Sequence, residues 1–531
     1  MSGSAADSTR SAQPPAQLGK GEKLGPVMRA LIVIERVGNR LPHPFWLFLG
    51  LALIVMILSS VFSALGTSVV NPATGEDVVA VNLFSAESLR DLVSNAVTNY
   101  VTFPALGLVL VVLFGVAVAE QSGLIPALMK SALRSASPRW VTVIVALVGS
   151  AASMASDAAY MIVIPLGGIA FKAVGRNPII GCAVAYAATA GGYSAAPFVN
   201  SLDAILGGLS TSAAQIIDES YVVTPVANLY FNFASMFVVA FAVTLVTELV
   251  LNKRGEQLAV DEDADDGVED HEAFARGASA TEKRGMIAAL IAMVLGIGLV
   301  IVLALPEASF LRDAEGGFGP ESGLMAGIAA IVGVGFFVLG IAYGVVTGSI
   351  RTWETIPNMM ADGVRPFVQV MVLFFAAAQF LAVFKASSLG EILAISGAQF
   401  FESVDAGPFV ILLGSSLLVG MGALFITSGT GLWTLLSVIL VPMLMLLGIS
   451  PEVTQAMYRI GDSTFNIVSP MSPYFIMILG FVQRYKKDAG IGTLLSLTIP
   501  LSITMWLCWT TFFFAWWALG IPFGPGSPVT Y

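Results

Sequence analysis

Two ionisable side chains and a proline stand inside an apolar stretch near the end of the chain. Arg459 and Asp462 are three residues apart in YRIGDSTFNIVSP, residues 458–470, which ends at Pro470. An ionised side chain at the centre of a membrane helix costs about 2.5–3.5 kcal/mol on insertion scales. The pair either neutralises itself on one helix face or binds a ligand beside the break. In the second case Arg459 holds a carboxylate, and Asp462 orients it or carries a coupling proton or sodium ion.

Two further acids stand near other interruptions of the apolar sequence. Asp203 follows GGYSAAP, residues 191–197, and is either a solvated loop acid or a carrier of the coupling ion. Asp157 lies in GSAASMASDAAY, residues 149–160, where an aspartate caps a helix or binds a cation. Both acids are therefore candidates for ion coupling.

Trp433 and a set of hydroxyl side chains complete the candidates. Trp433 follows ITSGTG, residues 426–431, and either anchors at the membrane interface or stacks on an aromatic ligand. Hydroxyl oxygens suit a hard cation such as Na⁺, although small polar residues also allow close packing of membrane helices. The hydroxyl residues at the interruptions are Ser150, Ser153, Ser156, Thr427, Ser428 and Thr430.

Composition places all of these residues in a membrane protein. The chain has 531 residues, of which 56% are hydrophobic and 11% charged, whereas soluble domains carry about 25% charged residues. Both histidines lie outside the apolar runs, and the two cysteines lie in separate ones, so we expect neither a disulfide nor a Cys–His metal site. The sequence has no P-loop motif. These absences disfavour an enzyme and an ATP-driven pump, and no cofactor or nucleic-acid partner is expected.

Charges between the apolar runs predict the topology by the positive-inside rule. Residues 1–43 are basic and predicted to be cytoplasmic, as is the acidic linker 253–284, which holds ten acidic and five basic residues. The linker separates two membrane halves, 44–252 and 285–520, and an uncharged tail, 521–531, is predicted to be external. The nine predicted crossings lie at 44–66, 101–120, 178–220, 225–251, 285–305, 323–347, 366–383, 449–483 and 491–519.

Two interrupted apolar segments are predicted to be re-entrant hairpins. Basic residues lie at both ends of residues 140–172, so both ends are predicted to be cytoplasmic. Two full crossings would need about 40 residues, more than this segment has. Residues 408–448 are predicted to form the second hairpin. Two full crossings in this segment would leave the later segments on the same sides of the membrane, so charge alone does not exclude them. A repeat supports this interpretation, because Gly175, Pro178, Ala183 and Pro197 recur at identical spacing as Gly448, Pro451, Ala456 and Pro470. Inverted repeats with broken helices are typical of secondary transporters.

The chain resembles the AbgT family of p-aminobenzoyl-glutamate transporters from about residue 30 to 520. The resemblance is carried by ERVGNRLPHPFWLF (35–48), VAEQSG (118–123), ASDAAYMIVIPL (155–166), GISPEVTQAMYRIGDS (448–463) and SPMSPYF (469–475). It implies a homodimer with nine spans and two opposed hairpins in each subunit. It also implies p-aminobenzoyl-glutamate uptake or proton-motive export of sulfonamide antimetabolites. The functional positions that it carries over are Asp203, Thr430, Trp433, Pro451, Arg459, Asp462 and Pro470.

The chain departs from the family pattern at three positions. Ala196 and Ala423 stand where the family typically has asparagine, and the segment TSGTGLW lacks a lysine found in relatives. The second break, in residues 458–470, keeps Arg459, Asp462 and Asn466, so we expect the charged side chains of the site to be concentrated there. We therefore expect an all-α inner-membrane transporter that carries aromatic anions and uses Na⁺ or H⁺ as coupling ion. A dicarboxylate carrier, a gated channel and an amide hydrolase are the alternatives.

Overall fold

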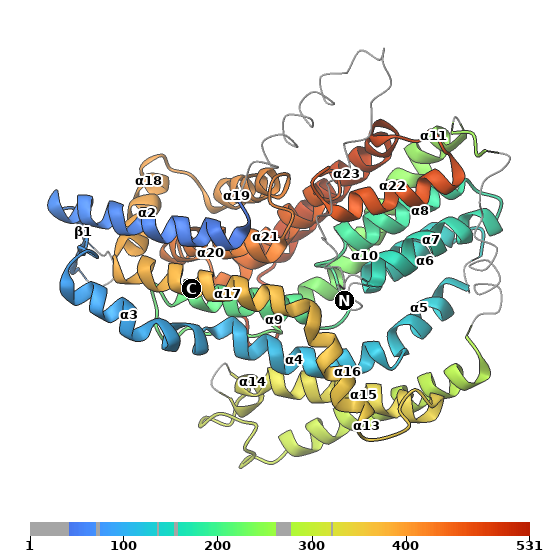
Figure 1. Ribbon diagram of the computed structural model, residues 1–531, viewed down its shortest axis with the longest axis horizontal. Helices are drawn as coiled ribbons and strands as arrows, with labels where there is room; N and C mark the ends of the chain where they lie inside the picture. The colour runs from blue at the N-terminus through green and yellow to red at the C-terminus, as the bar shows by residue number, and fades with distance from the viewer. Residues whose placement is uncertain are drawn as a thin grey trace, which may run out of the picture.

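The structure is a computed structural model and describes residues 42–70, 75–134, 137–152, 158–256, 258–261, 278–319 and 322–531. The chain is almost entirely helical (Figure 1), as expected where apolar segments must satisfy their backbone hydrogen bonds internally. Most of the linker 253–284, and residues 1–41 of the predicted cytoplasmic segment 1–43, lie outside the described residues.

The first half of the chain, to the end of the linker, contains the following elements. They are α2 (Pro44–Ala64), β1 (Ser68–Val70), β2 (Asp77–Val79), α3 (Ala86–Val101), α4 (Pro104–Gln121), α5 (Leu124–Arg134), α6 (Val141–Ala151), α7 (Ala158–Ala173), α8 (Pro178–Tyr186), the π-helix η2 (Ala187–Gly191), α9 (Ser201–Ala214), α10 (Leu229–Val246), the π-helix η3 (Thr247–Leu251) and α11 (Asn252–Glu256). The two strands pair antiparallel as a small hairpin after α2.

The second half continues with helices alone. They are α13 (Ala280–Ala304), α14 (Gly323–Ala326), α15 (Ile328–Thr347), α16 (Thr355–Val364), the 3₁₀ turn η4 (Arg365–Phe367), α17 (Val368–Ala386), α18 (Leu389–Ser403), α19 (Pro408–Ala423), α20 (Gly429–Leu446), α21 (Pro451–Asn466), α22 (Pro473–Tyr485) and α23 (Ile491–Ala518). Helices α3 and α18 and the strand pair were not predicted.

Eight helical runs in the described part of the chain are long and apolar enough to cross a membrane, judged by length and composition. Seven of them overlap predicted crossings, and the eighth is α20, a limb of the second predicted hairpin. The crossings predicted at 178–220 and 449–483 are broken into shorter helices. The membrane fold is confirmed, and the count of nine crossings stays a prediction.

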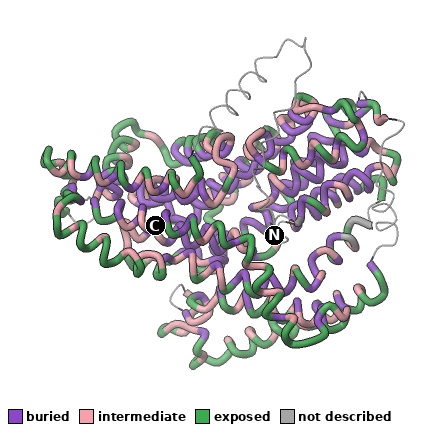
Figure 2. Tube along the Cα trace, viewed as in Figure 1, coloured by how far each residue is buried: buried purple, intermediate pink, exposed green. Residues whose placement is uncertain are grey.

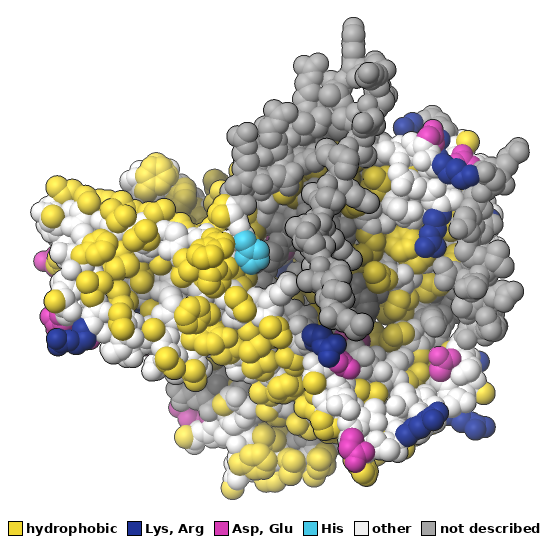
Figure 3. Space-filling model, viewed as in Figure 1, with side chains coloured by type: hydrophobic (Ala, Val, Ile, Leu, Met, Phe, Trp, Pro, Cys, Tyr) yellow, Lys and Arg dark blue, Asp and Glu magenta, His cyan; other side chains and the backbone are white. Residues whose placement is uncertain are grey.

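The helices form two packed groups with separate cores. One core joins α6, α7, α8, α10, α21, α22 and α23, and the other joins α2, α4, α9, α17, α18 and α20. Figure 1 shows much of the first group on the right and much of the second on the left. Figure 2 shows α13 largely exposed at the periphery, and only Gly285 and Ala289 of this helix are buried. Hydrophobic side chains cover much of the surface in Figure 3, as a lipid-facing surface requires.

Each predicted hairpin contains two helices, α6 and α7 in the first and α19 and α20 in the second. Helix α6 has 11 residues and spans about 16 Å, too little for a hydrocarbon core of about 30 Å. Helix α19 is separated from α20 by residues 424–428, close to the interruption predicted at 426–431. The tip of the first hairpin, with Ser153, Ser156 and Asp157, lies outside the described residues.

The repeated residues adopt the same local structure in both copies. Gly175 and Gly448 have φ of +77° and +78°, a left-handed conformation that glycine adopts without a steric penalty. A capping residue follows two positions later, and Pro178 and Pro451 then occupy the first turn of α8 and α21. Pro451 therefore starts a helix and does not interrupt one.

Both repeated helices end at a break, as predicted. Helix α8 continues into the π-helix η2, and non-helical residues 192–200 lead to α9. Helix α21 ends at Asn466, and Pro470 lies in the gap before α22. A Cβ at Gly191 would lie 3.2 Å from Ile467 Cγ2, so the two breaks lie side by side. The fold thus brings the two interruptions together, and buried residues of both belong to the first core.

Candidate functional site

The first element of the site is the N-terminus of α9. Asn200 caps this helix by accepting a hydrogen bond from the backbone N–H of Asp203 at 3.1 Å. Asp203 accepts in return from the backbone N–H of Asn200 through Oδ2 at 2.8 Å. This reciprocal capping box fixes the carboxylate at the break and leaves Oδ1 for other partners.

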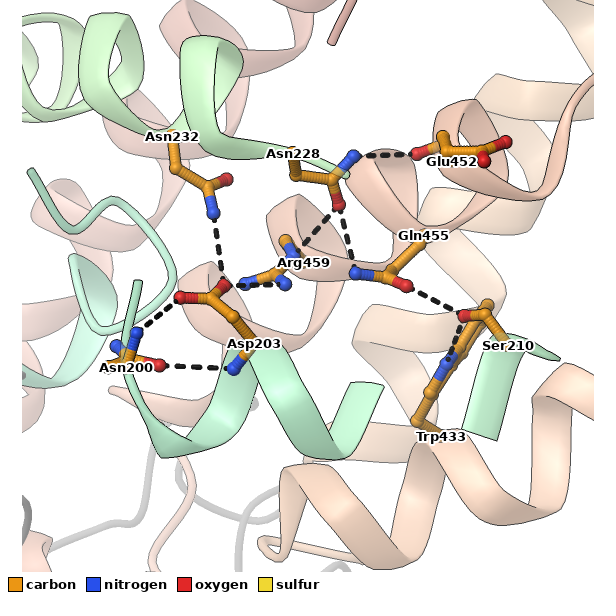
Figure 4. A network of polar contacts seen from close by, with 9 residues as sticks. All are labelled: Asn200, Asp203, Ser210, Asn228, Asn232, Trp433, Glu452, Gln455 and Arg459. Atoms are coloured by element: carbon orange, nitrogen blue, oxygen red, sulfur yellow. Dashed lines mark hydrogen bonds and ion pairs between the residues drawn. The ribbon is translucent and has the colours of Figure 1, made fainter. Parts of the chain in front are cut away.

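Arg459 projects from the middle of α21 onto that carboxylate. Its Nη2 lies 2.7 Å from Asp203 Oδ1, and the two side chains are 1% and 4% exposed. Its Nε donates to Asn228 Oδ1 at 3.1 Å, and Asn232 Nδ2 donates to Asp203 Oδ1 at 3.2 Å. Figure 4 shows this network joining α9, α10 and α21.

The ion pair corrects two expectations about the acids. Asp203 is buried, so the alternative of a solvated loop acid is wrong. Arg459 and Asp462 do share α21, but the described ion pair of Arg459 is with Asp203 on another element. The reason is geometric, because the break at 192–200 places the start of α9 directly against the middle of α21.

Trp433 lies inside the protein rather than at a membrane interface. Its side chain is fully buried, and its Nε1 donates to Ser210 Oγ at 3.1 Å. Its ring lies 4.4 Å, centroid to centroid, from that of Tyr458. The prediction of an interfacial anchor is therefore wrong. Stacking of Trp433 on a ligand requires Tyr458 to move, because Tyr458 occupies one face of the indole.

Asp462 faces the start of α20, at the second hairpin. A Cβ on Gly429, the first residue of α20, would lie 2.8 Å from Asp462 Oδ2. Oδ1 of Asp462 and Oδ1 of Asn466 are buried and lack a hydrogen-bond partner among the described residues. Asn466 Nδ2 donates to the Thr427 carbonyl at 3.1 Å, so both side chains lie at the hairpin. Such oxygens are the donors that a hard cation prefers.

The hydroxyl residues of the hairpins have different roles. Ser428 caps a helix, whereas Ser150 contacts the first break. Ser428 Oγ caps α20 by accepting from the backbone N–H of Gly431 at 3.2 Å. The carbonyl of Thr430 accepts from Thr434 Oγ1 at 2.7 Å, and the Thr430 side chain is partly exposed. Ser150 Oγ donates to the carbonyl of Ala188 at 3.4 Å, so the first hairpin contacts the first break.

Several polar residues of the site were missed by sequence reasoning. The amide group of Gln455 lies 3.0 Å from Asn228 Oδ1 and 2.7 Å from Ser210 Oγ, beside the guanidinium of Arg459. The signal for Gln455 was available, because it lies four residues before Arg459 on the same helix face. The signals for Asn200, Ser210, Asn228 and Asn232 were weaker, since none of these side chains is charged.

Known proteins resemble this chain in sequence and in structure. Residues 29–531 match the model of a family described as "AbgT putative transporter family". The chain belongs to the AbgT family. It is 33% identical over 493 residues to the p-aminobenzoyl-glutamate transport protein of Escherichia coli (strain K12), covering 93% of this chain and 95% of the relative. It is therefore a multi-pass membrane transporter, and a small-molecule substrate follows from the family.

Two solved structures of AbgT transporters share the fold. The YdaH transporter of Alcanivorax borkumensis superposes with a TM-score of 0.84 at 37% identity, covering 91% of this chain and all of that one. MtrF of Neisseria gonorrhoeae, described within a class of antimetabolite efflux pumps, superposes with a TM-score of 0.88 at 36% identity, covering 94% and 100%. In this AbgT member, Ala196 and Ala423 are both buried.

Proposed function

We propose that this chain carries p-aminobenzoyl-glutamate-type aromatic anions across the cell membrane by alternating access, coupled to a proton or sodium gradient. The observation that carries the proposal is the buried Arg459–Asp203 pair at the meeting point of the two broken helices. The naming of a relative for p-aminobenzoyl-glutamate transport supports the substrate class, and a relative among antimetabolite efflux pumps supports sulfonamides as further substrates. Net uptake and net export both fit this mechanism.

The binding step is an exchange of partners at Arg459. A substrate carboxylate takes the place of Asp203 on the guanidinium, which presents paired N–H donors that match a carboxylate. Asp203 then has to become neutral, because an unpaired buried carboxylate is costly. An anion and a proton are in this way taken up together. Movement of Tyr458 frees the face of Trp433 for the benzoyl ring, and Thr430 adds a hydrogen bond.

A sodium ion is the second candidate for coupling. Asp462 Oδ1 and Asn466 Oδ1 supply two buried oxygens without hydrogen-bond partners in the described structure. The backbone carbonyl of Thr427 lies close to them, since it accepts from Asn466 Nδ2 at 3.1 Å. Asp157, Ser153 and Ser156 of the first hairpin are proposed as the matching set, with Ser428 a less suitable ligand because it caps α20.

The arrangement in the membrane belongs to the same proposal. The N-terminus is cytoplasmic and residues 521–531 are external, in keeping with the charge distribution along the sequence. The two hairpins enter from opposite sides, and two copies form a homodimer that holds one helix group still while the other rocks. Alternating access by rocking of one repeat against another is general for transporters with inverted repeats.

The test is transport by purified protein in proteoliposomes. Labelled p-aminobenzoyl-glutamate and a labelled sulfonamide are offered under separately imposed proton and sodium gradients. Arg459→Ala is expected to abolish transport, and Arg459→Lys to reduce it strongly because the paired donors are lost. Arg365→Ala is the matched control, since Arg365 is 81% exposed and pairs only at the surface with Asp362.

The outcomes separate the alternatives. Unchanged transport by Arg459→Ala would contradict the role of this residue. Accumulation against a gradient that an ionophore collapses excludes a channel. Transport of succinate-like dicarboxylates without p-aminobenzoyl-glutamate would favour the dicarboxylate carrier. Release of p-aminobenzoate would favour a hydrolase.

A further inference from the structure

Helix α21 carries a stripe of polar side chains along one face. Its members are three or four residues apart, the spacing that places side chains on the same side of a helix. They are Glu452, Gln455, Arg459, Asp462 and Asn466. The proposed function gives roles to three of them, and Gln455 supports Arg459 through Asn228. Glu452, at the start of the helix, has no role in that mechanism although it is only 3% exposed.

The carboxyl group of Glu452 is buried without a cation. Its Oε2 accepts a hydrogen bond from the Tyr221 hydroxyl at 2.9 Å. The ion pairs formed between described residues do not include Glu452. An ionised carboxylate is far more costly to bury than a neutral carboxyl that keeps its hydrogen bonds. Burial therefore favours the neutral acid at Glu452, whereas the hydrogen bond from Tyr221 and the position in the first turn of α21 favour the carboxylate, so a change in burial changes the balance.

Glu452 is connected to the ion pair through one side chain. Its backbone carbonyl accepts from Asn228 Nδ2 at 2.9 Å, and Asn228 Oδ1 accepts from Arg459 Nε at 3.1 Å. Figure 4 shows Glu452 at one end of this network and Asp203 at the other. A displacement of the first turn of α21 would therefore change the contacts of Arg459 as well.

Residues 521–531, here called the C-terminal tail, cover this end of α21. Ser450 Oγ donates to the carbonyl of Pro528 at 2.8 Å, and Ile449 forms an isolated antiparallel bridge with Thr530. The Tyr531 ring packs edge-on against Tyr221, with centroids 5.7 Å apart. Tyr221 and the tail thus stand between Glu452 and the exterior of the protein.

Few other charged groups surround Glu452. The loop that follows α9 contributes Tyr221, with Asp218 near Tyr221. The tail contributes Tyr531, which packs on Tyr221, and α21 itself carries Arg459 and Asp462 about two and three turns further along. Helices α19, α20 and α23 bring no charged side chain, and α10 brings the amides Asn228 and Asn232. The proton on Glu452 is therefore governed mainly by access of water.

We propose that Glu452 binds and releases a proton in each transport cycle, an inference that rests on the proposed transport function. When Tyr221 and the C-terminal tail separate from the first turn of α21, water reaches the carboxyl, its O–H bond breaks and the proton passes to a water molecule as hydronium. Before closure a hydronium ion returns a proton to a carboxylate oxygen and leaves as water. Opening and proton release are thus linked, and Asn228 transmits the movement to Arg459.

Infrared difference spectroscopy of the full-length protein tests proton binding without any substrate. The C=O stretching band of a protonated carboxyl is expected in the wild type and is expected to disappear on titration to high pH. Glu452→Gln removes this component, whereas Glu402→Gln, at an exposed position on α18, retains it. Identical pH-difference spectra for wild type and Glu452→Gln would overturn the inference.

Proteoliposomes test the link to transport. Glu452→Gln is expected to retain exchange of labelled for unlabelled p-aminobenzoyl-glutamate and to lower accumulation driven by a proton gradient, because only the proton taken up at Asp203 remains. Glu452→Asp is expected to keep part of that accumulation. Full proton-driven accumulation by Glu452→Gln would overturn the inference. If the wild type shows the infrared component but transports no p-aminobenzoyl-glutamate, the substrate assignment fails and the inference stands.

A second variant covers the case in which Glu452→Gln does not fold. Tyr221→Phe keeps the ring against Tyr531 and removes the hydroxyl that donates to Glu452. It is expected to shift the pH at which the infrared component disappears. An unchanged pH for that step would count against the inference.

Discussion

At the scale of single residues, the site depends on a few buried charges with defined partners. Arg459 and Asp203 are nearly inaccessible, and each is the other's counter-ion. A buried ion pair contributes little net stability, but removal of one member leaves an uncompensated charge. The pair is therefore suited to a site that has to exchange one carboxylate for another while remaining folded.

Asp203→Asn tests this balance. The amide keeps the shape of the side chain but leaves the guanidinium of Arg459 without its counter-ion, so we expect a loss of about 3–5 kcal/mol in the free energy of unfolding. Thermal unfolding in detergent measures the change. Adding Arg459→Gln to Asp203→Asn should recover part of the stability and none of the transport. A double variant no more stable than Asp203→Asn would contradict the pairing.

At the scale of elements, the breaks and helix ends decide where the side chains lie. The capping box starts α9 at Asn200, so Asp203 lies at the break rather than in a loop. Pro451 starts α21 after Gly448, and the helix then carries its polar stripe without interruption to Asn466. On the second hairpin, Ser428 starts α20, which places Gly429 against Asp462.

Gly429→Ala tests the contact between the second hairpin and α21. The added methyl group would meet Asp462 Oδ2 at 2.8 Å and Tyr458 Oη at 3.5 Å, so the carboxylate has to shift. We expect impaired transport and an altered dependence on the coupling ion, with the protein still folded. Gly414→Ala, on the other limb of the hairpin, is the control because a Cβ there meets no atom within 4 Å. Equal transport by both variants would show that the contact is unimportant.

The loop between α13 and α14 gives a prediction about pH. Backbone N–H groups of Gly317 and Gly319 donate to Asp313 at 2.6 and 3.1 Å and hold the pKa of this carboxyl below its usual value. Because the pKa of Asp313 is lower in the folded state than in the unfolded state, its carboxylate stabilises the loop at pH values above the unfolded-state pKa of Asp, about 3.9. That stabilisation is lost as the pH falls through the lowered pKa.

Amide hydrogen exchange measures this effect. After correction for intrinsic rates, the amides of Gly317 and Gly319 should be protected at neutral pH and lose protection in acid. Asp313→Asn should show weaker protection at neutral pH and little dependence on pH. Protection in the wild type that does not change with pH would rule out the carboxylate as its cause.

At the scale of the whole molecule, the site lies between two helix groups with separate cores. Helices α9 and α20 belong mainly to one core, and α10 and α21 mainly to the other. A change in their relative position would therefore alter the contacts of Asp203, Arg459 and Trp433 together. The C-terminal tail is part of this arrangement because it joins the start of α21 to the first turn of α10.

A disulfide across the tail tests whether it has to move. Ile449 and Thr530 face each other in an antiparallel bridge, where the separation of Cα atoms suits a disulfide. With Cys508 replaced by serine, Ile449→Cys combined with Thr530→Cys is expected to lose net transport on oxidation and regain it with a reductant. The single variant Ile449→Cys is the control. Full transport by the oxidised double variant would show that the tail can stay closed.

Much of the fold was determined by local sequence. Long apolar runs form helices because the bilayer leaves no other way to satisfy the backbone, and glycine followed by a capping residue and proline fixes helix starts. The repeat at Gly175 and Gly448 and the breaks near 192–200 and 467–472 were therefore predictable. Helices α3 and α18 were missed because their composition is mixed and their packing partners are distant in sequence.

The pairing of side chains was decided only by the tertiary structure. The sequence identified Arg459, Asp462, Asp203 and Trp433 as candidates, because charged and amphipathic groups are costly in an apolar chain. It suggested Asp462 as the partner of Arg459, since spacing along one helix is visible in sequence. The observed partner, Asp203, is 256 positions away, and only the packing of α9 against α21 brings the two together. Contacts between distant elements depend on how whole helices pack, which no local pattern records.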